Sequence, residues 1–316
     1  MPVSQAKSKS GISDFPAGAW WQIVKRTYTK QVDHNLSLIS AGVAFYFLLA
    51  IFPLLAGIIS LYGLLVSPEQ LQSHMGYLVD AVPTGSGYIL EEQLTRLTEN
   101  SNRALSWGFG LSLLLTLWSS SKGANALITA CNIAYNEEHG RNFLKGILAR
   151  LVLTISIILL VISALLCISV LPEWISWVAG PLLNESNAMW ITWPVLMLLF
   201  NVGLAGLYRY GPHRRQAKWR WVTVGSAFAT IMWLIASYAF SFYLNEFASY
   251  NKTYGSVGGI VILLMWFFLS AYIILLGAEL NSATEYQTDM DSTAGKDKPK
   301  GERGAYVADH SPSDSS

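Results

Sequence analysis

The chain has 316 residues, of which 52% are hydrophobic and 13% are charged, and its formal net charge at pH 7 is +1. The mean hydropathy is +0.37. Soluble domains carry about 25% charged residues, so this composition excludes an ordinary soluble domain and indicates a membrane protein. The small net charge points to no particular partner. The two cysteines, Cys131 and Cys167, lack the spacing of a metal or redox motif, so we expect no metal site and no cofactor.

The chain begins with two segments that we place outside the bilayer. Residues 1–16 are polar and small, which predicts a disordered N-terminus. In residues 17–35, Trp, Ile, Val and Tyr alternate with Lys and Arg, which predicts a juxtamembrane amphipathic helix on anionic lipid headgroups at the cytoplasmic face. An ordinary juxtamembrane segment without lipid binding is the alternative.

The first apolar segment, Leu36–Val66, is too long for a simple crossing. As a helix it would be roughly 45 Å long, against a hydrocarbon core of about 30 Å. Pro53 lies inside it and removes one backbone hydrogen-bond donor, so a bend is expected there. We treat Pro53 as a candidate hinge, and simple accommodation of the excess length is the alternative.

The rest of the chain alternates between apolar segments and polar connections. Two amphipathic segments between Ser67 and Asn100 predict an extracytoplasmic helical hairpin. Five further spans are predicted near 104–121, 147–171, 190–208, 219–244 and 257–280. The fold class is therefore an all-α polytopic membrane protein, with six transmembrane helices in a membrane domain of residues 36–281. Residues 282–316 are rich in Ser, Asp, Lys and Gly, which predicts a disordered cytoplasmic tail.

Basic residues divide unequally between the two sides that these spans define. With the N-terminus inside, 18 of the 21 Lys and Arg fall on the inner side, and three fall on the outer side. This is the asymmetry of the positive-inside rule, and an odd number of spans would remove it. Both termini are therefore expected in the cytoplasm.

Polar residues gather near the predicted inner ends of several spans. Lys122, Asn125, Thr129, Asn132 and Asn136 recur at steps of three and four, which places them on one face of a helix. We predict a candidate polar cluster, in which Glu279 pairs with Lys122 or Arg209. Its members are Lys122, Asn125, Asn132, Arg209, Glu279 and Asn281. Side chains that merely reach the membrane interface are the alternative.

Three long stretches and one short stretch carry a family resemblance. They are AGVAFYFLLAIFPLLAGIISLYG (41–63), LWSSSKGANALITACNIAYNEEHGRNFLKGILARL (117–151), YGSVGGIVILLMWFFLSAYIILLGAELN (254–281) and LYRYGPHRR (207–215). In order and spacing they resemble the YihY/BrkB family of bacterial inner-membrane proteins, over residues 20–285. The resemblance implies a six-helix protein of the bacterial inner membrane. That family was formerly labelled ribonuclease BN-like and has no agreed catalytic residues to carry onto this chain.

These observations favour a transporter or translocation factor for a small solute or lipid, because polar groups at one depth and a bent helix suit an alternating cavity. A membrane scaffold for envelope or virulence functions is the alternative. A ribonuclease is disfavoured, because the five histidines are isolated in the sequence. The basic residues at 214–220 are explained by anionic lipid headgroups, so no nucleic acid is expected. The sequence leaves the oligomeric state open.

Overall fold

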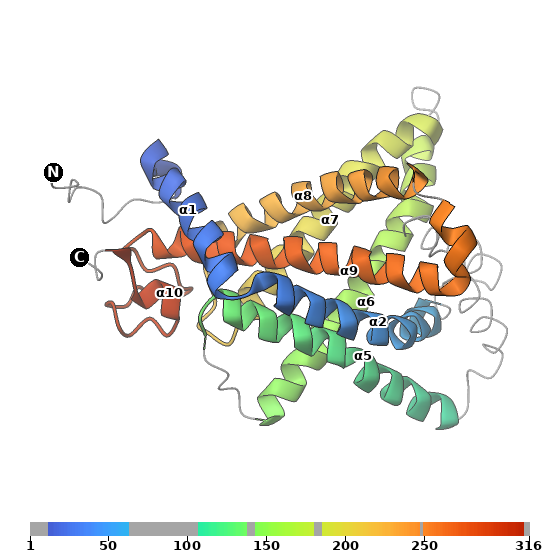
Figure 1. The fold of residues 1–316 in the computed structure, drawn as a ribbon, viewed down its shortest axis with the longest axis horizontal. Coiled ribbons are helices and arrows are strands. Elements are labelled where there is room, and N and C mark those ends of the chain that lie inside the picture. Colours follow the sequence, from blue (N-terminus) through green and yellow to red (C-terminus); the bar gives the residue numbers. More distant parts are fainter. Residues whose placement is uncertain (1–11, 63–106, 138–142, 180–184, 247–248, 313–316) are drawn as a thin grey trace.

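The computed structural model describes residues 12–62, 107–137, 143–179, 185–246 and 249–312 (Figure 1). Their only β-type pairing is an isolated bridge between Ala217 and Thr293, so the all-α prediction is confirmed. The elements in order are η1 (Ile12–Asp14), α1 (Ala17–Asp33), α2 (Leu36–Tyr62), α5 (Trp107–Ala134), α6 (Phe143–Ala179), α7 (Glu185–Tyr210), α8 (Trp219–Glu246), α9 (Ser249–Tyr286) and α10 (Tyr306–Asp309). The predicted extracytoplasmic hairpin lies outside the described residues.

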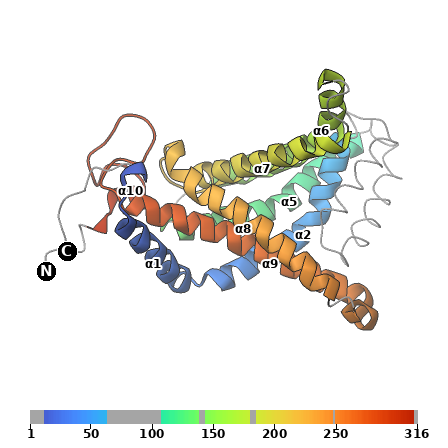
Figure 2. The ribbon, with the colours of Figure 1, turned by 90° about the horizontal axis from the view of Figure 1, so that it is seen from above.

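The long helices form one bundle in which chain neighbours are also neighbours in space. In the described part of the chain, α2 packs on α5, α5 on α6, α6 on α7, α7 on α8 and α8 on α9. Helix α9 then packs on α2 and closes the circuit. Figure 1 shows α9 along the length of the bundle, with α8 on one side and α2 on the other. The first and last described helices, α1 and α10, lie at the same end, which we call the terminal end (Figures 1 and 2).

Several helices are long and apolar enough to cross a membrane. Among the described residues these spans are Phe143–Pro172, Ile191–Tyr210, Trp219–Leu244 and Gly258–Tyr286. Helices α1 and α2 meet at an angle of 65° and form one more candidate if taken together. The chain is therefore a polytopic α-helical membrane protein, and the count of six spans stays a prediction. Helix α2 continues through Pro53, whose role as a hinge also stays a prediction.

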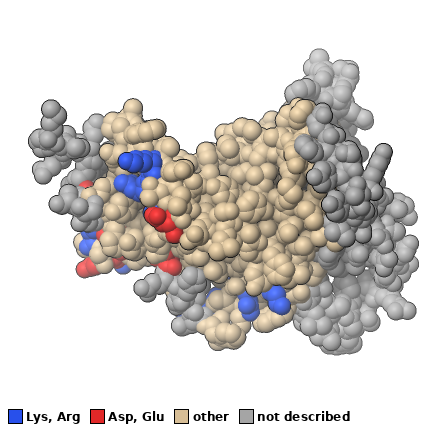
Figure 3. Space-filling model, viewed as in Figure 1, with Lys and Arg blue, Asp and Glu red and all other residues tan. Residues whose placement is uncertain are grey.

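The surface of the bundle matches a bilayer environment. Figure 3 shows a broad area without Lys, Arg, Asp or Glu, with charged side chains at its left and lower edges. Large apolar side chains such as Leu159 of α6, Leu198 of α7 and Ile235 of α8 are exposed on the span helices. Exposed apolar area on this scale would be unfavourable in water and is stable against lipid tails. These helices therefore contact the lipid bilayer.

The C-terminal residues are folded, in contrast to the sequence prediction. Helix α9 extends to Tyr286, and residues 287–312, here called the C-terminal cap, pack on the loop of residues 211–218. The backbone N–H of Arg215 donates to the carbonyl of Gly304 at 2.8 Å, and that of Ala294 donates to Gln216 at 2.7 Å. The predicted disorder is therefore wrong for residues 282–312.

A hydrogen-bond network explains why the cap folds without an apolar repeat. The buried Arg303 donates to the carbonyls of Ala308 and Asp289, each at 2.7 Å. Asp291 accepts from the backbone N–H groups of Thr293 and Lys298, each at 2.8 Å. Polar groups satisfied in this way can be buried without the penalty of an unmade hydrogen bond. A search for apolar periodicity does not detect such a segment.

The N-terminal prediction of disorder also differs from the structure where the chain is described. The side chain of Phe15 is buried, with its ring 6.1 Å from that of Trp20 and 6.4 Å from that of Trp221. One aromatic residue therefore anchors the start of α1 to the bundle. Within the predicted juxtamembrane segment, α1 buries Ile23 and Thr27 and leaves Trp21 and Tyr28 exposed.

Candidate functional site: a groove between α2, α5 and α6

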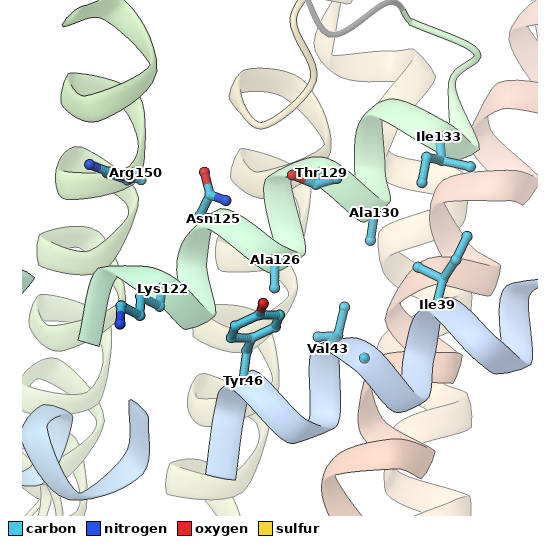
Figure 4. A pocket seen from close by; sticks show the side chains of 11 residues that line it. Ile39, Val43, Tyr46, Lys122, Asn125, Ala126, Thr129, Ala130, Ile133 and Arg150 are labelled. Atoms are coloured by element: carbon cyan, nitrogen blue, oxygen red, sulfur yellow. The ribbon is translucent and has the colours of Figure 1, made fainter. Parts of the chain in front are cut away.

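A groove of about 600 Å³ runs between α2, α5 and α6. Figure 4 shows its lining side chains on three separate helices. They are Ile39, Gly42, Val43 and Tyr46 from α2; Lys122, Asn125, Ala126, Thr129, Ala130 and Ile133 from α5; and Arg150 from α6. The groove thus has aliphatic walls and a short polar strip.

Helix α5 supplies the polar strip through its spacing. Lys122, Asn125 and Thr129 are separated by three and four residues, so they share one face of the helix, and all three line the groove. The opposite side packs tightly, because a Cβ atom at Gly123 would lie 3.1 Å from Ala50 Cβ. Helix α5 runs from Trp107 to Ala134, so the predicted span near 104–121 and the polar-faced stretch after it form one continuous helix in the described residues. Where the membrane span ends within this helix stays a prediction.

Helix α2 supplies the opposite wall. Ile39, Gly42, Val43 and Tyr46 follow the i, i+3, i+4, i+7 pattern of one helical face. No atom lies within 4 Å of the position that a Cβ atom of Gly42 would occupy, so this wall has open space in front of it. Figure 4 shows the Tyr46 ring projecting toward α5, near Ala126. Tyr46 therefore places a hydroxyl beside the polar strip.

Arg150 adds a second cation to the lining. Its guanidinium carbon lies 4.6 Å from the centre of the Trp118 ring, a cation–π contact with α5. Its Nε atom is buried and has no hydrogen-bond partner in the described structure. The lining contains Lys122 and Arg150 and no Asp or Glu. The groove therefore carries two positive charges that its own walls do not neutralise.

The groove lies deep along the helices. Ten residues of α2 separate Leu36 from Tyr46, about 15 Å at a rise of 1.5 Å per residue. Twelve residues of α5 separate Lys122 from Ala134, about 18 Å. Tyr46 and Lys122 therefore lie about 15 to 18 Å along their helices from the first residue of α2 and the last residue of α5.

The other predicted cluster members lie elsewhere and have separate partners. Asn132 Oδ1 accepts from the backbone N–H of His213 at 2.6 Å. Asn281 Oδ1 accepts from the backbone N–H of Gly225 at 2.7 Å. Arg209 donates to the carbonyl of Ala217 at 2.6 Å. Only Lys122 and Asn125 of the predicted six line the groove, so the structure does not bring the cluster together.

The predicted pairing of Glu279 with Lys122 or Arg209 is wrong. Glu279 Oε1 lies 2.5 Å from Nδ1 of His34, at the elbow between α1 and α2. The guanidinium of Arg209 instead lies 4.7 Å from the ring centre of Trp219. The similar depth predicted for Glu279, Lys122 and Arg209 therefore did not imply contact between them, because Glu279 and Arg209 have other partners.

Three polar groove residues were absent from the predicted cluster of six. Thr129 belongs to the polar face predicted for α5, whereas Tyr46 and Arg150 lie outside that face. Tyr46 belongs to a nearly uniform apolar segment, and Arg150 had been counted only as an inner-side charge. Neither carries a sequence signal that points to the other helices. Among the described residues, no group of three or more His, Cys, Asp or Glu could hold a metal ion.

The long apolar helices, their lipid-facing surface and the polar groove define a polytopic all-α membrane protein. The chain belongs to the family described as virulence factor BrkB, whose model matches residues 27–302. This confirms the resemblance found in the sequence.

Individual relatives agree with this assignment. The chain is 34% identical to the ribonuclease-like protein YfkH of Bacillus subtilis over 82% of this chain and 94% of that protein. It is 25% identical to a UPF0761 membrane protein of Tolumonas auensis, over 86% and 88% of the two chains. It is 23% identical to a UPF0761 membrane protein of Vibrio campbellii, over 80% and 79%. No solved structure matches the chain.

Proposed function

We propose that this protein is a translocation factor of the bacterial inner membrane and that the groove between α2, α5 and α6 binds the anionic group of its substrate. The observation that carries the proposal is the pair of cations, Lys122 and Arg150, in an open groove without an acidic partner. The proposal includes a position for Lys122 and Arg150 near mid-membrane depth, where a charged side chain costs at least about 2.5–3.5 kcal/mol. A wet, anion-binding role explains why this cost is tolerated.

The lining indicates the class of substrate. A guanidinium and an ammonium group bind phosphate or carboxylate oxygens, and Tyr46, Asn125 and Thr129 can add hydrogen bonds. The aliphatic walls suit an acyl chain or another apolar part of the substrate. Both an anionic lipid and a small organic anion have this chemistry. One relative has a ribonuclease-like name. The described side chains, however, include no group of three or more His, Cys, Asp or Glu that could hold the metal ions of a nuclease.

The proposal includes a membrane topology. We place the terminal end in the cytoplasm, with six crossings and the exposed basic residues Lys25 of α1 and Arg220 of α8 at anionic headgroups, following the positive-inside rule. Substrate would then enter the groove from the cytoplasmic side or from the inner leaflet. Reporter fusions at both ends of the chain test this arrangement, and opposite locations for the two ends would contradict it.

Reconstitution into liposomes tests the translocation itself. One arm follows a headgroup-labelled phosphatidylglycerol, a second follows a labelled phosphatidylcholine, and a third follows efflux of a small organic anion. We expect the rate in the arm that carries the substrate to fall at least about tenfold in Lys122→Gln and Arg150→Gln, because a hydrogen bond to a charged group contributes about 1.5–3 kcal/mol. Lys145→Gln is the matched control, since Lys145 is exposed on α6 and does not line the groove.

The three arms separate the outcomes. Movement of phosphatidylglycerol alone identifies an anionic lipid, and efflux alone identifies a soluble anion. Equal movement of both lipids would contradict recognition of the charge. No movement in any arm would overturn translocation and favour a scaffold, for which the folded C-terminal cap offers a surface at the terminal end.

A further inference from the structure

His34 and Glu279 form a buried pair apart from the groove. The Glu279 side chain is 0% exposed and that of His34 is 16% exposed, with Nδ1 and Oε1 2.5 Å apart. The other ring nitrogen of His34 lies 2.9 Å from Oδ1 of Asn136. These residues come from α9, from the α1–α2 elbow and from the end of α5, so one imidazole joins three parts of the bundle.

The second oxygen of Glu279 is the unexplained feature of this pair. Its Oε2 atom is buried and has no hydrogen-bond partner among the described residues. A buried carboxylate oxygen without a hydrogen-bond partner destabilises the folded state. Binding a proton removes the negative charge that causes this destabilisation. Because carboxyl groups and imidazoles exchange protons readily, the site can hold a proton at either member.

The neighbouring cations on α1 have hydrogen-bond partners outside this pair. On α1, Lys30 lies near enough to interact with both members, and its Nζ donates to Ser282 Oγ at 3.0 Å. Arg26, one turn earlier, donates to Gln287 at 2.9 Å. On α5, the thiol of Cys131 is the titratable group that interacts with Glu279. Among the described residues, Glu279 is the acidic side chain that pairs with His34.

We propose that His34 and Glu279 form a proton-binding site, reached from the terminal end through the partly exposed imidazole, and that the bound proton keeps the α1–α2 elbow docked on α9. When His34 carries the proton, the imidazolium donates to the Glu279 carboxylate. When the proton leaves to solvent from His34, a buried negative charge remains, with Lys30 alone close to it. The hydrogen bond between the elbow and α9 then loses the positive charge of its donor and is weakened.

The surroundings of His34 agree with this assignment. The hydrogen bond to Glu279 raises the pKa of His34 above its ordinary value, against the opposing effect of burial. The elbow leads directly into Ile39, Gly42 and Val43, the α2 wall of the groove. Protonation would therefore act on the substrate site, and this last link alone rests on the proposed function.

Histidine NMR on the full-length protein in nanodiscs tests the site without a transport assay. The His34 resonance, assigned with His34→Gln, should titrate with a midpoint above about 6.5, the ordinary value for histidine. In Glu279→Gln, which keeps the shape and removes the charge, that midpoint should fall by at least about one pH unit. His213→Gln is the matched control and should leave the His34 midpoint unchanged.

Two results would overturn the proposal. One is a wild-type His34 midpoint at or below the ordinary value, which can be read without any Glu279 variant. The other is an unchanged midpoint in a folded Glu279→Gln protein. If Glu279→Gln does not fold, Glu279→Asp gives the same comparison, because a shorter carboxylate should weaken the pair and lower the midpoint. None of these readings depends on whether the protein moves a substrate.

Discussion

Gly225 of α8 and Asn281 of α9 meet where the two helices cross, and the Gly225 N–H donates to Asn281 Oδ1 at 2.7 Å. Asn281 Nδ2 also donates to the carbonyl of Val222 at 3.1 Å. A Cβ atom at Gly225 would lie 2.1 Å from the carbonyl oxygen of Gly277, so only glycine fits. Small residues with an interhelical amide are a usual means of close helix packing in membranes. Gly277 therefore lies at a close approach of α8 and α9.

Gly225→Ala should therefore destabilise the bundle. The methyl group would overlap backbone that cannot move alone, and overpacking of this kind costs about 1–3 kcal/mol or more. Gly206→Ala in α7 is the control, because no atom lies within 4 Å of its Cβ position, and it should be neutral or slightly stabilising. Thermal unfolding in detergent compares the two. Equal midpoints would show that α8 and α9 are not closely apposed.

Glu285→Ala should be more damaging than a change at an exposed ion pair. Arg214 and Glu285 form a two-point ion pair, at 3.0 Å and 2.7 Å, with both side chains fully buried. Removing one partner leaves a buried charge and costs about 3–5 kcal/mol. Asp297→Asn is the control, because the Lys218–Asp297 pair is exposed and such pairs contribute about 0–1 kcal/mol.

The measurement is the unfolding midpoint of each variant, together with that of Arg214→Met/Glu285→Leu. The double variant removes both charges and should recover most of the lost stability. Failure of the double variant to recover would mean that the hydrogen bond from Ser292 to Glu285, at 2.8 Å, matters more than the charge pair.

Stability should fall as pH rises through the range of His34. Its folded-state pKa is raised by the hydrogen bond to Glu279, so protonated His34 stabilises the native state. That contribution to stability is complete at pH values below the pKa of histidine in the unfolded state, about 6.5. It is lost as the pH rises through the higher pKa of His34 in the folded state. Wild type should have a higher unfolding midpoint at pH 6 than at pH 8.5. In His34→Gln this difference should shrink, and an unchanged difference would assign it to another group.

Lys122→Met should increase stability while abolishing translocation. Lys122 has no acidic partner among the groove-lining residues, and a Lys at the proposed mid-membrane depth costs about 2.5–3.5 kcal/mol. An apolar side chain of similar length removes that cost and the proposed anion contact together. Unfolding in nanodiscs and flux in liposomes give the two readings, with Lys145→Met as control. Loss of stability in Lys122→Met would assign Lys122 a structural role.

The sequence was informative about the helices and much less so about their contacts. Hydropathy located the long apolar segments, and the three-and-four spacing placed Lys122, Asn125 and Thr129 on one face of α5. The partner of Glu279 could not be predicted, because His34 is more than 240 residues away and reaches it only through the packing of the α1–α2 elbow on α9. The C-terminal cap was missed for a different reason, since polar hydrogen bonds hold it rather than an apolar repeat.

Gly42→Leu should block the groove without disturbing the bundle. The position of a Gly42 Cβ atom has no neighbour within 4 Å, so a leucine side chain can extend into the groove beside Val43. A leucine also has a better helix propensity than glycine, by up to about 1 kcal/mol. We therefore expect an unfolding midpoint at or above that of wild type and a flux reduced at least about tenfold. Gly206→Leu adds the same side chain to α7, away from the groove. It should leave both the unfolding midpoint and the flux at their wild-type values. Full flux in Gly42→Leu would show that substrate does not pass between α2 and α5, whereas a lower midpoint would show that this space is needed for packing.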